Sequence, residues 1–73
     1  MNEELPTEPN EIFELIVKAD EKLKYATSER GDARAEQARA LLERARDAAR
    51  AIGNDGLVGQ AETRLRDLEG DAS

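Results

Sequence analysis

One stretch of the chain, residues 32–53, limits the possible folds more than any other. It reads DARAEQARALLERARDAARAIG. Its main apolar side chains recur every three or four residues, at Ala38, Leu42, Ala45, Ala49 and Ile52. This spacing predicts a helix with one apolar side and charged side chains around the rest. A helix of about 20 residues is roughly 30 Å long, and its apolar side must be covered by another part of the chain.

A second amphipathic helix is predicted before this stretch. Its apolar positions follow the same spacing, at Ile12, Ile16, Ala19, Leu23 and Ala26. Pro9 favours a start near Pro9 or Asn10, because proline suits the first helical turn, where its missing N–H costs nothing. Thr27 and Ser28 mark the expected end of the helix.

The two predicted helices are joined by a short link. We expect Gly31 to adopt the left-handed conformation in this link and Asp32 to cap the next helix through its carboxylate. Because the link is short, the helices should form an antiparallel hairpin over Pro9–Ile52.

A third helix is predicted after the GNDG break at residues 53–56. We expect it to run from Asp55 to Glu69, with Asn54 or Asp55 as its cap. Its apolar positions are Val58, Ala61, Leu65 and Leu68. Glycine in a helix costs up to about 1 kcal/mol relative to alanine, so Gly59 suggests a close approach by another helix. Gly70 should end the helix.

These elements predict an all-α fold: an antiparallel helical hairpin plus a shorter third helix, packed as a three-helix bundle. The single domain should span residues 9–70, between disordered tails at residues 1–8 and 71–73. A chain of 73 residues buries only about 60% of its unfolded surface. Its aromatic residues are Phe13 and Tyr25, so the core should be thin, and a second chain could complete it.

Composition excludes several classes of function. The chain has no cysteine and no histidine, which removes disulfides, thiolate metal sites and the usual proton shuttle at neutral pH. We therefore expect no enzyme activity, no cofactor or metal, and no small-molecule substrate. No apolar run is long enough for a membrane span or a secretory signal, so we expect a cytoplasmic protein. The net charge of −6 makes general binding to nucleic acid or an anionic membrane unfavourable.

Apolar residues at the border of the stripes are the main candidates for a contact surface. They are Leu15, Val17, Leu41 and Leu57. They could form a second surface for self-association or for a partner helix, or they could lie loosely buried at the rim of the core. Arginines on the polar side of the central helix could meet an acidic partner, although their alternation with carboxylates also fits a solvated face. These candidates are Arg39, Arg46 and Arg50.

The segment at residues 38–65, ARALLERARDAARAIGNDGLVGQAETRL, resembles a tetratricopeptide-type hairpin of bacterial regulators. In this resemblance, Ala38, Leu42 and Ala45 match the small, large and small packing positions of a repeat's second helix, and an I-G-N-D-G turn follows. Small residues let a neighbouring helix come close. The first two predicted helices are longer than those of the repeat, and three long helices are also similar to a microtubule-interacting-and-transport module. Either resemblance implies a binding surface without catalysis.

The sequence thus predicts a small non-catalytic helical module for protein–protein interaction, most simply a homodimer. The alternative is a nucleic-acid-associated regulatory protein that uses the arginine face of the central helix.

Overall fold

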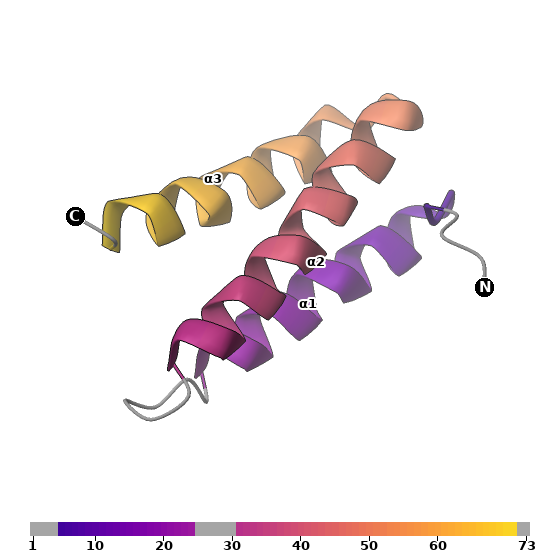
Figure 1. Cartoon of the computed structure of the whole chain (residues 1–73). Coiled ribbons are helices and arrows are strands. Elements are labelled where there is room, and N and C mark those ends of the chain that lie inside the picture. The colour runs from indigo at the N-terminus through magenta and orange to yellow at the C-terminus, as the bar shows by residue number, and fades with distance from the viewer. Residues whose placement is uncertain (1–4, 25–30, 72–73) are drawn as a thin grey trace.

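The part of the chain that the structure describes forms three helices. The computed structural model describes residues 5–71 apart from 25–30, with α1 at Pro9–Lys24, α2 at Gly31–Ala51 and α3 at Asp55–Asp71. In Figure 1, α1 and α2 run antiparallel and α3 turns back across α2. The described residues contain no strand, so the predicted all-α bundle is confirmed. With 17 residues, α3 is shorter than α2, which has 21, and close to the 16 of α1.

Helix α1 begins where the sequence predicts. The carbonyl of Glu8 accepts a hydrogen bond from the N–H of Ile12 at 3.1 Å, and Pro9 is the first helical residue. The predicted end of this helix, with Tyr25, Ala26, Thr27 and Ser28, lies outside the described residues.

Two predicted helix boundaries are wrong. Helix α2 already begins at Gly31, so this glycine is a helical residue and does not form the link. Helix α3 continues to Asp71, so Gly70 does not end it. Glycine lowers helix propensity but does not prevent a helix from continuing.

The turn between α2 and α3 contains only three residues. Gly53 has a φ of 71°, which is the left-handed conformation that glycine adopts without strain. Its N–H donates to the carbonyl of Arg50 at 3.1 Å, and the N–H of Asn54 donates to that of Ala49 at 2.8 Å. These two bonds form a Schellman motif, which satisfies carbonyls at the end of α2.

Asn54 also caps the following helix. Its Oδ1 accepts a hydrogen bond from the N–H of Leu57 at 3.1 Å, and its carbonyl accepts one from Val58 at 3.1 Å. Both bonds are those of an N-cap residue. Of the two caps that the sequence allows, Asn54 is therefore the one used.

The core lies between α2 and its two neighbours. Helix α2 packs against both α1 and α3, whereas α1 and α3 touch each other much less. The largest fully buried side chains are Ile12, Ile16 and Leu42. Four alanines of α2 are also fully buried: Ala38, Ala45, Ala48 and Ala49. Their small side chains allow close packing of the helices, and the predicted apolar side of the central helix is confirmed.

The expectation for Gly59 is wrong. This residue is exposed, and a Cβ added to it would meet no atom within 4 Å. Gly59 precedes the buried Ala61 by two residues, which is about 200° around a helix. It therefore lies on the side of α3 that faces away from the core.

Candidate interaction surface

The four apolar border residues lie in different environments. Val17 is 38% exposed and Leu57 is 8% exposed. Leu15 and Leu41 are partly buried and pack against the core. Leu57 belongs to the core because it lies one helical turn before Ala61. Of the two alternatives for these residues, burial therefore applies to Leu57, and its side chain is not available for a surface contact.

Among the described residues, the most exposed large apolar side chain is not one of these four candidates. Phe13 is 46% exposed and lies four residues before Val17. Residues four apart share one side of a helix, so both side chains lie on the same outer side of α1. We call these two residues the α1 strip. The sequence could have indicated this exposure, because Phe13 directly follows Ile12 of the apolar stripe and lies about 100° from it around the helix.

The α1 strip lies on the side of α1 that is turned toward α3. Asp20 follows Val17 by three residues and continues the same side of the helix. Its carboxylate accepts hydrogen bonds from Nε of Arg64 on α3 at 2.9 and 3.1 Å. This ion pair links the two outer helices of the bundle.

Two acidic residues and one lysine border the outer edge of the strip. Glu14 follows Phe13 directly, and Glu21 follows Val17 by one helical turn. Both are exposed, and neither forms an ion pair within the part of the chain that the structure describes. Lys18, which is also exposed, lies between them on the same side of the helix, four residues after Glu14 and three before Glu21. This edge therefore carries mixed charge.

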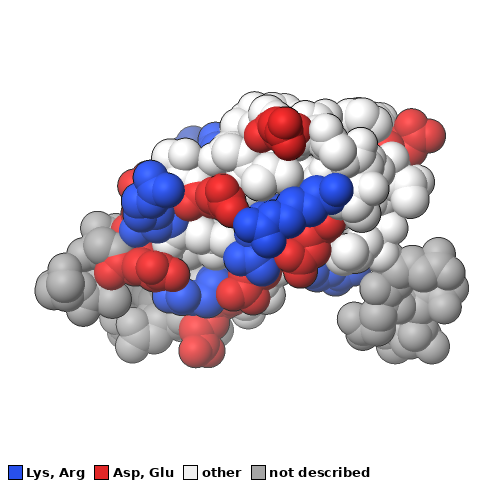
Figure 2. Space-filling view, turned by 90° about the horizontal axis from the view of Figure 1, so that it is seen from above, with Lys and Arg blue, Asp and Glu red and all other residues white. Residues whose placement is uncertain are grey.

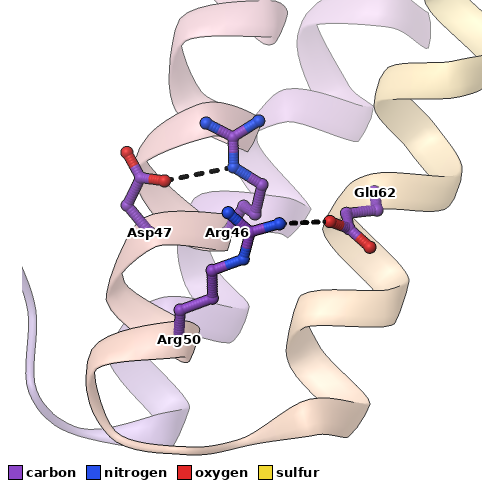
Figure 3. A network of polar contacts seen from close by, with 4 residues as sticks. All are labelled: Arg46, Asp47, Arg50 and Glu62. Carbon is purple, nitrogen blue, oxygen red and sulfur yellow. Dashed lines mark hydrogen bonds and ion pairs between the residues drawn. The ribbon is translucent and has the colours of Figure 1, made fainter.

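Two of the three candidate arginines contact carboxylates of their own chain. Nε of Arg46 lies 3.1 Å from Oδ1 of Asp47, and Nη2 of Arg50 lies 2.6 Å from Oε2 of Glu62 on α3 (Figure 3). The third, Arg39, is half-buried. Figure 2 shows basic and acidic side chains interleaved on one face of the molecule. Arg46 and Arg50 thus lie beside negative charges of their own chain.

A shallow hollow of about 490 Å³ lies between α1 and the residues before it. It is lined by Leu5, Pro6, Thr7, Glu11, Glu14, Leu15 and Lys18. Residues 5–7, assigned to a tail from the sequence, therefore lie beside α1, and the predicted tail residues 1–4, 72 and 73 lie outside the described residues.

Over the described residues, no polar or charged side chain is buried, and no three potential metal-ligating side chains cluster together. None of the helices there has the length and apolar character to span a membrane.

No family model, curated protein or solved structure matches the chain. The resemblances to tetratricopeptide and microtubule-interacting-and-transport modules therefore stay predictions.

Proposed function

We propose that this chain is a small non-catalytic helical module that binds protein through the α1 strip. The observation that carries the proposal is the exposure of Phe13 and Val17, at 46% and 38%, on the same side of one helix. Removing apolar surface from water contributes about 25 cal/mol per Å². Covering both side chains therefore favours the complex. The bundle already fixes the backbone at this site.

Two features of the chain support a binding role over a catalytic one. The sequence contains no histidine or cysteine, so the commonest nucleophile and proton-transfer groups are missing. The helices also provide a rigid backbone, which lowers the entropy cost of binding. The proposal includes a cytoplasmic location, and either a second copy or a foreign protein could supply the covering surface.

The test compares the native chain with the double variant Phe13→Ser/Val17→Ser. Sedimentation over a concentration series measures self-association, and affinity capture from cell extract measures the retained protein per bound module. We expect one of the two signals in the native chain and its loss in the double variant. Leu5→Ser is the matched control, because Leu5 is 37% exposed but lies outside the strip. The absence of both signals in the native chain would contradict the proposal.

The geometry supports the alternative, a nucleic-acid-associated regulatory protein, less well than it supports protein binding. Arg46 and Arg50 are paired with Asp47 and Glu62, and phosphate binding would have to compete with these contacts. Electrostatic binding to nucleic acid is strongest at low salt. We therefore expect a gel-shift assay at low ionic strength to show no complex, and a shifted band would favour the alternative.

A further inference from the structure

We draw no further inference here: the strongest candidate, the exposed apolar strip of Phe13 and Val17 on the outer side of α1, carries nothing beyond the proposed function, because its edge holds charges of both signs and nothing in the structure shows what covers it.

Discussion

Replacing Gly59 with alanine should stabilise the protein. Gly59 is the fifth residue of α3, it is exposed, and its φ is not positive. An added Cβ meets no atom within 4 Å, so the substitution introduces no clash. Alanine in a helix interior is more favourable than glycine by about 0.8–1.0 kcal/mol. The gain arises mainly from the smaller conformational freedom of the unfolded chain.

Gly53→Ala is the matched control and should have the opposite sign. A Cβ at Gly53 also meets no atom within 4 Å, so the two substitutions differ mainly in backbone conformation. The φ of 71° at Gly53 is a left-handed conformation, which costs a residue with a Cβ about 1–2 kcal/mol. The variants should therefore differ from each other by about 2–3 kcal/mol.

Thermal and urea unfolding followed by circular dichroism measure this difference. In a domain of this size, 1 kcal/mol shifts Tm by about 4–8 °C. Gly59→Ala should therefore melt several degrees above the native chain and Gly53→Ala several degrees below it. A Gly59→Ala variant that is no more stable than the native chain would refute the reasoning, because the outer side of α3 would then not be free.

Three further predictions concern the core, the cap and the ion pair between the outer helices. Leu42→Ala should lower the free energy of unfolding by about 2–5 kcal/mol, since Leu42 is fully buried. Leu41→Ala should lower it by less, and equal losses in urea unfolding would contradict the assignment of the core side of α2. Asn54→Ala should cost about 0.5–2 kcal/mol and Asn54→Asp little, measured in the same way, because the side-chain oxygen is the acceptor. A double-mutant cycle on Asp20 and Arg64 should give a coupling of about 0.2–1 kcal/mol that decreases with salt, and zero coupling at low salt would show that the pair does not link α1 to α3.

The three helices could be predicted from the sequence because each has a clear apolar side. Ile12 and Ile16 in α1 and Leu42 in α2 recur at helical spacing, and the structure buries all three. The α2–α3 turn could also be predicted. Glycine readily adopts the left-handed conformation that ends a helix, as at Gly53, and asparagine caps the start of a helix through its side-chain oxygen, as at Asn54.

The surface was harder to predict than the core. The apolar pattern of one helix does not say how far its neighbours reach around it, and this decides whether a border residue is covered. Leu57 is covered and Phe13 is not, although both lie at the edge of a stripe in the sequence. Gly59 shows the same limit. A glycine inside a helix suggests that another helix passes close to it, but in the structure no atom lies within 4 Å of a Cβ added there.

The α2–α3 turn also fixes the rotation of one helix relative to the other. Asn54 belongs both to the motif that ends α2 and to the cap that begins α3, so no linker residue separates the two functions. One inserted residue would rotate everything beyond it by about 100° and shift it by about 1.5 Å if taken up as helix. Leu57 and Leu65 would then turn away from α2. This turn therefore tolerates changes of side chain better than changes of length, and it sets the phase on which the packing of α3 depends.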